Sequence, residues 1–141
     1  MNLDANPELF YFEVPGPFAV KGSTFSFVDR RGQLRTKTDS KHGKTFAAAV
    51  QWAAKRAGVP LIPKGRGVTL SVVYGFPRPK GRDAKRAEPC VRPDVDKLSR
   101  ALLDALTGIA YADDGQVVAL SVQKVYSDQV RARVIVMAAA S

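Results

Sequence analysis

The pattern of apolar and polar residues predicts three strands before residue 77. Leu9–Val14 alternates until Pro15-Gly16-Pro17 interrupts it, and Ser23–Val28 is a second β-rich stretch. A basic turn at Arg30-Arg31-Gly32 follows, where we expect a hairpin. The run Val68–Phe76 is rich in Val, Leu and Tyr and stops at a proline, which is typical of a buried strand.

Two stretches have helical periodicity instead. Apolar residues recur at three- and four-residue steps between Ser40 and Ala57, which predicts the first helix. A clearer stripe predicts the second, with Gly108 as its terminator. The stripe consists of Val95, Leu98, Leu102, Ala105 and Ile109.

The C-terminal part predicts two further strands, Val117–Tyr126 and Val130–Met137. Ser127-Asp128-Gln129 joins them, so we expect a final hairpin of the sheet. No repeat or linker divides the chain. The order of elements predicts a single domain over residues 1–141, an α/β or α+β fold in which a mixed sheet packs against two main helices.

The composition narrows the class of protein. Its 22 Lys and Arg residues against 13 Asp and Glu give a formal charge of +9, which favours a polyanionic partner such as nucleic acid. A well-solvated basic surface, or a partner that is an acidic protein, is the alternative. The single cysteine, Cys90, cannot form an intramolecular disulfide, and no apolar run is long enough to span a membrane. We therefore expect a soluble, cytoplasmic protein.

Acidic residues stand at both ends of the second predicted helix. Asp94 and Asp96 precede it, and Asp113 and Asp114 follow it. The helix from Asp96 to Thr107 advances about 17 Å, whereas the seven steps from Thr107 to Asp114 can span about 23 Å, so a segment 108–112 that runs back nearly extended along the helix could return the second pair to the first. Converging carboxylates would fit a hard cation such as Mg²⁺. When either pair is taken alone, helix capping or ordinary turn chemistry is the more usual explanation, and only the two pairs together favour a metal site.

The same residues carry a family resemblance. Arg92-Pro-Asp-Val-Asp-Lys-Leu, Arg100-Ala-Leu-Leu-Asp-Ala-Leu-Thr-Gly108, Asp113-Asp-Gly-Gln-Val117 and the later Lys124 resemble the RusA family of Holliday-junction resolvases. The resemblance is strongest over Arg92–Tyr126. It implies a homodimeric endonuclease, of phage or prophage type, that uses Mg²⁺, with Mn²⁺ as a substitute, to nick a four-way DNA junction in two opposed strands. Recombination and repair of DNA are the processes implied.

The resemblance also implies roles for individual residues. Asp94, Asp96 and Asp114 correspond to the essential carboxylates, with Asp113 as a further metal ligand or a support. Arg100 stands where the family motif has a lysine needed for activity. Lys97 departs from the pattern, because an asparagine often follows the second aspartate.

Basic residues within this motif and outside it form the predicted DNA-binding set. The loop between Arg78 and Arg86 is expected to follow phosphates rather than to read bases, unless it is only a solubilising loop. The full set is Lys21, Arg78, Lys80, Arg82, Lys85, Arg86, Arg92, Lys97 and Lys124. Weaker support exists for a DNA contact by a second basic cluster, Arg30, Arg31, Arg35 and Lys37. Two rival hypotheses stay open: a metal-dependent nuclease for other branched DNA, and a basic junction-binding protein without activity.

Overall fold

The protein folds around a four-stranded mixed sheet. A computed structural model describes residues 7–22, 24–38 and 42–139. The strands are β1 (Glu8–Pro15), β4 (Val68–Phe76), β5 (Val117–Tyr126) and β6 (Arg131–Ala138), in the spatial order β1-β6-β4-β5. β4 pairs parallel with β5 and antiparallel with β6, which in turn pairs antiparallel with β1.

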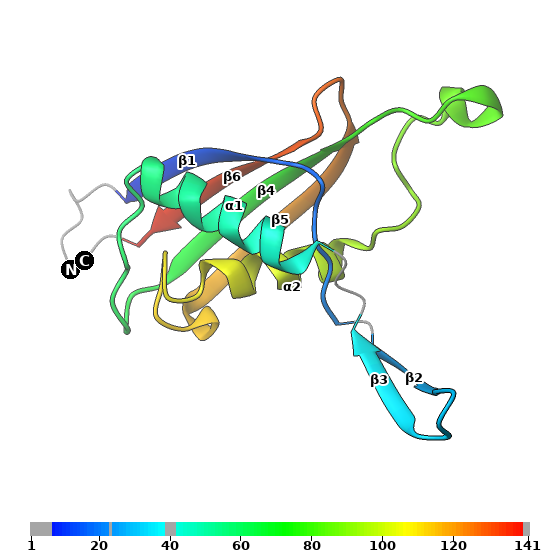
Figure 1. Cartoon of the computed structure of the whole chain (residues 1–141). Coiled ribbons are helices and arrows are strands. Elements are labelled where there is room, and N and C mark those ends of the chain that lie inside the picture. Colours follow the sequence, from blue (N-terminus) through cyan, green and yellow to red (C-terminus); the bar gives the residue numbers. More distant parts are fainter. Residues whose placement is uncertain (1–6, 23, 39–41, 140–141) are drawn as a thin grey trace.

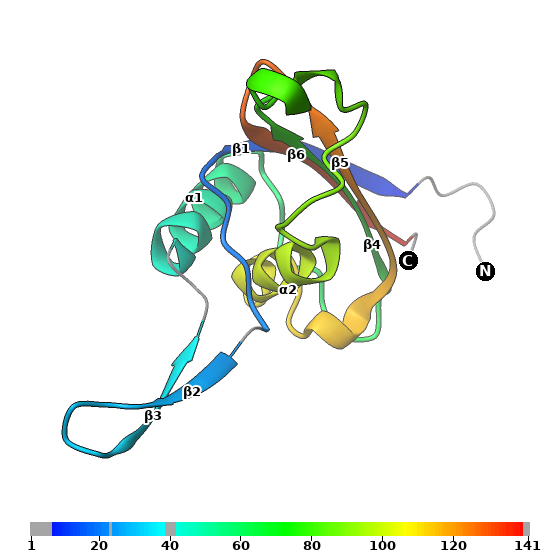
Figure 2. The ribbon, with the colours of Figure 1, turned by 90° about the vertical axis from the view of Figure 1, so that its right-hand side faces the viewer.

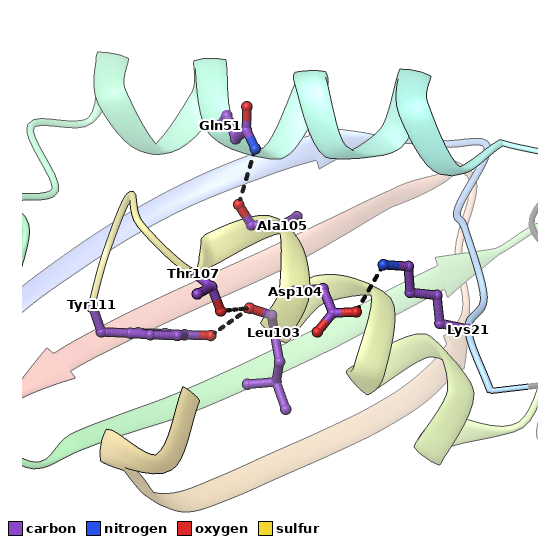
Figure 3. Close-up of polar contacts among 7 residues, drawn as sticks. All are labelled: Lys21, Gln51, Leu103, Asp104, Ala105, Thr107 and Tyr111. Atoms are coloured by element: carbon purple, nitrogen blue, oxygen red, sulfur yellow. Dashed lines mark hydrogen bonds and ion pairs between the residues drawn. The ribbon is translucent and has the colours of Figure 1, made fainter. Parts of the chain in front are cut away.

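Both α-helices cover the same face of this sheet (Figures 1 and 2). They are α1 (Gly43–Arg56) and α2 (Val95–Leu106). The core lies between the two layers, because every second side chain of the central strand β4 is fully buried there and meets apolar residues of both helices. Figure 3 shows one polar link across the helix pair, in which Gln51 Nε2 on α1 donates to the carbonyl of Ala105 on α2 at 3.3 Å.

Two shorter elements stand apart from this layered core. β2 (Thr24–Val28) and β3 (Leu34–Thr38) form a separate two-stranded hairpin that extends away from the sheet (Figures 1 and 2). The 3₁₀ helices η1 (Gly81–Lys85) and η2 (Asp114–Gln116) interrupt the connections on either side of α2.

Most predicted elements are present, and the mixed α+β architecture is confirmed. The expected beginnings at Ser23 and Ser40 lie outside the described residues. The final hairpin is wrong: β5 and β6 do not pair, because β4 lies between them. β4, α2 and β5 instead form a parallel β-α-β crossover, which places β5 at the edge of the sheet.

Candidate active site

The first acidic pair lies at the N-terminus of α2. Asp94 is the N-cap residue and Asp96 lies in the first turn, and both residues are exposed. The Asp94 side chain makes no capping hydrogen bond, and its Oδ2 lies 3.6 Å from Lys97 Nζ one turn later. Helix capping therefore does not occupy the Asp94 carboxylate, which leaves it available to a ligand.

Lys124 of β5 fixes the chain immediately before this pair. Its ammonium group donates to the carbonyl oxygens of Val91 at 2.7 Å and Pro93 at 2.9 Å. Hydrogen bonds from a charged donor are among the stronger ones in proteins. The edge strand thus holds the backbone from which Asp94 extends. Lys124 belongs to the predicted DNA-binding set; that role stays a prediction, and the structure adds an anchoring role.

Arg100 lies one helical turn after Asp96, so the two side chains share a face of α2. Its guanidinium group packs over Gly22, where an added Cβ would stand 2.7 Å from Arg100 Nη1. Gly22 also has a φ of +107°, which disfavours any other residue there. The close approach explains why a glycine occupies this position.

Lys21 holds the same segment against α2. Its backbone N–H donates to the carbonyl of Lys97 at 3.1 Å. Its side chain forms an ion pair with Asp104, with Nζ 2.8 Å from Oδ2 (Figure 3). The ammonium group predicted to bind DNA is therefore paired within the protein, across an exposed contact that a phosphate could replace.

The second acidic pair is built into a capped turn. Asp113 Oδ1 accepts from the backbone N–H of Gly115 at 2.9 Å, and Gln116 completes a reciprocal capping box. The hydrogen bond from Gly115, and next the contact with the Asp114 side chain, lower the pKa of Asp113. Asp113 therefore has a structural role, whereas the exposed Asp114 carboxylate is the freer of the two.

Gln116 holds this turn with both ends of its amide. Its Oε1 accepts from the backbone N–H groups of Ala112 and Asp113 at 2.9 and 3.0 Å. Its Nε2 donates to the carbonyls of Ile62, Pro63 and Arg66 at 3.0–3.2 Å. This role of Gln116 was not predicted from the sequence, although an acid followed three positions later by glutamine is a capping-box signature.

The two acidic pairs lie near opposite ends of α2, with η2 beside the C-terminal end of the helix (Figure 1). The expected extended return of residues 108–112 is wrong. Gly108, at φ +83°, turns the chain, and its N–H donates to the carbonyl of Tyr111 at 2.7 Å. The Tyr111 hydroxyl donates to Leu103 in the last turn of α2 at 2.8 Å (Figure 3), and burial raises the pKa of this phenol.

This turn determines which carboxylates can share a ligand. Within the described residues there is no group of three or more His, Cys, Asp or Glu side chains that could hold a metal ion. The predicted convergence of Asp94, Asp96, Asp113 and Asp114 is thus not found within one chain. A helix of 12 residues is about 18 Å long, and the tight turn at Gly108 does not carry the chain back along it.

The basic loop is folded rather than open. The guanidinium of Arg78 donates to the carbonyls of Ala84 and Arg86 and lies 4.7 Å from the ring centroid of Tyr126. Arg86 forms an ion pair with Asp83 at 3.3 Å. These two arginines therefore shape the loop. The remaining members of the set here are exposed and form no ion pair within the described residues: Lys80, Arg82, Lys85 and Arg92.

Two further basic residues lie beside the second acidic pair. An open hollow of about 490 Å³ has Lys64, Arg66, Asp113 and Gln116 among its lining residues. The charge of Lys64 contributes to the lowered pKa of Asp113. Lys64 is exposed, whereas Arg66 is half-buried and its guanidinium donates to the Ala139 carbonyl. The sequence signal for these residues was the cluster Lys64-Gly65-Arg66-Gly67.

Comparison with known proteins identifies the family. Residues 17–137 match the family described as endodeoxyribonuclease RusA. The chain belongs to the RusA family. The predicted resemblance is thus confirmed, and the match spans α2, both acidic pairs and Lys124. RusA membership makes this protein an endodeoxyribonuclease, a hydrolase that cleaves DNA.

One curated relative is similar to this chain over most of its length. The chain is 30% identical over 111 residues to the uncharacterized protein YqaN of Bacillus subtilis strain 168, and the alignment covers 73% of this chain and 77% of YqaN. Within the described part of this RusA protein, no helix has the length and apolar character to cross a membrane.

Proposed function

We propose that this endodeoxyribonuclease resolves four-way DNA junctions by paired, symmetric nicks, as a homodimer that depends on Mg²⁺. The family match over residues 17–137 carries the proposal, because it includes every element that presents the acidic and basic residues described above. The formal charge of +9 supports a DNA substrate. A junction is nearly two-fold symmetric, so a two-fold dimer would meet matched strands.

Asp94 and Asp96 are the residues that would hold the metal ion at the N-terminus of α2. They fit, because Mg²⁺ commonly takes one or two carboxylates from a protein and completes its shell with water and substrate phosphate oxygens. Bound Mg²⁺ would supply an activated water and charge stabilisation at the phosphodiester. Asp114 is the third essential carboxylate of the proposal and Asp113 its support. Neither pair alone makes a three-carboxylate site.

Residues around Asp94 would orient the DNA strand. Arg100 follows Asp96 on the same helix face and would contact the scissile phosphate, where its planar guanidinium can donate two hydrogen bonds. Lys97, which now pairs with Asp94, would transfer to a neighbouring phosphate when Asp94 binds metal. Arginine cannot donate a proton at neutral pH, so Arg100 stabilises charge and does not protonate the leaving oxygen.

The edge of the sheet supports a homodimer. β5 is an outer strand, and its first half exposes apolar side chains. Val118 is 75% exposed and lies where the β4–β5 register shifts, and Leu120 is 41% exposed. Exposed apolar edge strands tend to pair with other chains, and natural proteins usually cover them. A second copy at this edge is the covering partner that we propose.

Cleavage of an end-labelled four-way junction tests the proposal. We expect symmetric, ligatable nicks in Mg²⁺ or Mn²⁺, none in EDTA, and none on linear duplex. Asp94→Asn, Asp96→Asn and Asp114→Asn should each abolish nicking while they retain the fold and junction binding. Because the three side chains are exposed, these variants should unfold at nearly the wild-type temperature.

Other results would separate the rival hypotheses. Unpaired nicks on flaps or forks as fast as on four-way junctions would indicate a nuclease for other branched DNA. Junction binding without any cut, in either metal, would indicate a protein that only binds. Full activity in all three asparagine variants would contradict the proposed carboxylate roles.

A further inference from the structure

The β2–β3 hairpin has no function in the site described above. It forms its own sheet and extends from the layered core (Figures 1 and 2). An isolated two-stranded hairpin is marginally stable in water. A projecting hairpin is therefore a candidate for contact with a partner, and the chemistry of its tip indicates which partner that is.

Both carboxylate oxygens of Asp29 accept hydrogen bonds from within the tip of the hairpin. Its Oδ1 accepts from the backbone N–H groups of Arg31 and Gln33, both at 2.9 Å, and its Oδ2 accepts from Arg35 Nε at 3.0 Å. These hydrogen bonds, the one from Gln33 first, lower the pKa of Asp29. The only acid between residues 24 and 38 thus neutralises Arg35 and fixes the turn.

The two arginines at the turn have no such partner. Arg30 and Arg31 are exposed, and neither forms an ion pair within the part of the chain that the structure describes. Both charges sit on a hydrogen-bonded turn, in which the backbone N–H of Gly32, at φ +76°, donates to the Asp29 carbonyl at 3.0 Å. The tip therefore presents two adjacent free guanidinium groups.

An apolar pair adjoins these arginines. Val28 and Leu34 are cross-strand partners at the end of the hairpin, and they are 67% and 73% exposed. Proteins that kink or open DNA place apolar side chains against base steps while neighbouring basic side chains hold the phosphates. A two-stranded ribbon also has the width that enters a DNA groove.

We propose that the β2–β3 hairpin is a DNA-contacting arm, in which Arg30 and Arg31 hold backbone phosphates and the Val28–Leu34 pair packs against the base pair exposed at a branch point. The inference rests on the proposed action on branched DNA. Charge decides between DNA and a second copy of the chain as the partner. A tip with two free arginines is attracted by a polyanion, whereas a second copy also carries a charge of +9.

Three double variants test the arm. Arg30→Gln/Arg31→Gln removes the phosphate contacts, and Val28→Ser/Leu34→Ser removes the apolar pair. A third variant, Lys55→Gln/Arg133→Gln, is the charge-matched control, because it removes two exposed charges from α1 and from β6. The measurements are the Kd for a four-way junction and for duplex at several salt concentrations, the molar mass by light scattering, and cleavage.

The arginine variant should bind both DNAs at least about tenfold more weakly at low salt, with the slope of log K against log salt reduced by about 2, since each lost phosphate contact removes about 0.9. The serine variant should weaken junction binding about tenfold and leave duplex binding nearly unchanged, because only the junction exposes a base pair. The control should change either Kd by less than about threefold.

The arm would be excluded if both hairpin variants bound the junction like the control. Loss of dimer mass in the serine variant, with unchanged DNA affinity per dimer, would assign the hairpin to subunit contact and also overturn the proposal. Weaker DNA binding by the hairpin variants would support the arm even if the wild-type protein cut no junction. That last result would contradict the proposed function alone.

Discussion

Lys124 is the residue whose role the structure changes most. Its ammonium group joins the edge strand to the carbonyls of Val91 and Pro93, and so sets where Asp94 begins α2. Lys124→Met should lower the junction cleavage rate at saturating DNA at least about tenfold, because displacement of a reacting group by 1 Å can cost on the order of 100-fold. Single-turnover kinetics measure this rate, and Kd should change by less than about threefold.

A matched substitution separates this role from DNA contact. Lys124→Arg keeps a cation that can donate to both carbonyls and should recover part of the lost rate. If Lys124 instead bound a phosphate, Lys124→Met would weaken binding, reduce the salt slope by about 1 and leave the saturated rate intact. That pattern would contradict an anchoring role.

Gln116 holds the turn of the second acidic pair, as Lys124 holds the chain before the first pair. Gln116→Ala removes the two Nε2 hydrogens that are shared among three carbonyls and the Oε1 that accepts from two N–H groups, which should lower the free energy of unfolding by about 1–3 kcal/mol. Gln116→Glu keeps the shape but points an acceptor at three carbonyls, so we expect it to be at least as destabilising. Urea unfolding measures both, and wild-type stability in the glutamate variant would contradict the donor role.

At the scale of elements, two turns depend on ionised aspartates. The pKa values of Asp29 and Asp113 are lowered by hydrogen bonds from backbone N–H groups. A lowered native pKa contributes stability above the unfolded value of 3.8, and this contribution is lost as pH falls through the native value. Asp113→Asn should therefore lose less stability than wild type between pH 6 and pH 3. Thermal unfolding of both proteins across this pH range measures the difference. Parallel curves of unfolding temperature against pH would contradict a stabilising role for the ionised Asp113.

The strands and helices of the core were predictable because their burial is periodic. Val68–Phe76 and Val117–Tyr126 have the predicted bounds. Of the stripe predicted for α2, Leu98, Leu102 and Ala105 are buried, whereas Val95 is 42% exposed and Ile109 lies beyond the helix. Pairing was not predictable in the same way. The link Ser127–Gln129 resembles a hairpin turn locally, yet β4 separates the strands it joins, and only long-range packing determines that insertion.

The geometry of the candidate site could not be predicted from the sequence. Resemblance to the family motif predicts Asp94, Asp96 and Asp114 as site residues, and these roles stay predictions, but chain length permitted a return path that the turn at Gly108 does not take. The hydrogen-bond partners of polar side chains also could not be predicted from the sequence. The carbonyls that engage Arg78 and Lys124 lie on other segments, and nothing in a basic side chain's identity indicates whether it faces a phosphate or a carbonyl.

At the scale of the whole molecule, charge predicts how the protein meets DNA. Exposed basic residues on the loop before α2, on the hairpin tip and around Lys64 belong to a chain of net charge +9. Each contacted phosphate releases condensed counterions, so junction affinity should fall steeply as salt rises. The exposed β5 edge raises a second question at this scale, which is whether one copy of the chain acts alone.

The homodimer prediction can be tested at that edge. Val118→Lys adds a charge where the side chain is largely exposed, so folding should be unaffected, but a subunit contact would bury the lysine at considerable cost. We expect wild type to have the mass of a dimer by light scattering at micromolar concentration. Val118→Lys should be a monomer that cuts junctions slowly and without symmetry.

Leu61→Lys, at an exposed apolar residue outside the sheet, is the control and should remain dimeric. A wild-type monomer that still made paired nicks would contradict the dimer, whereas a Val118→Lys dimer would assign the interface to another surface.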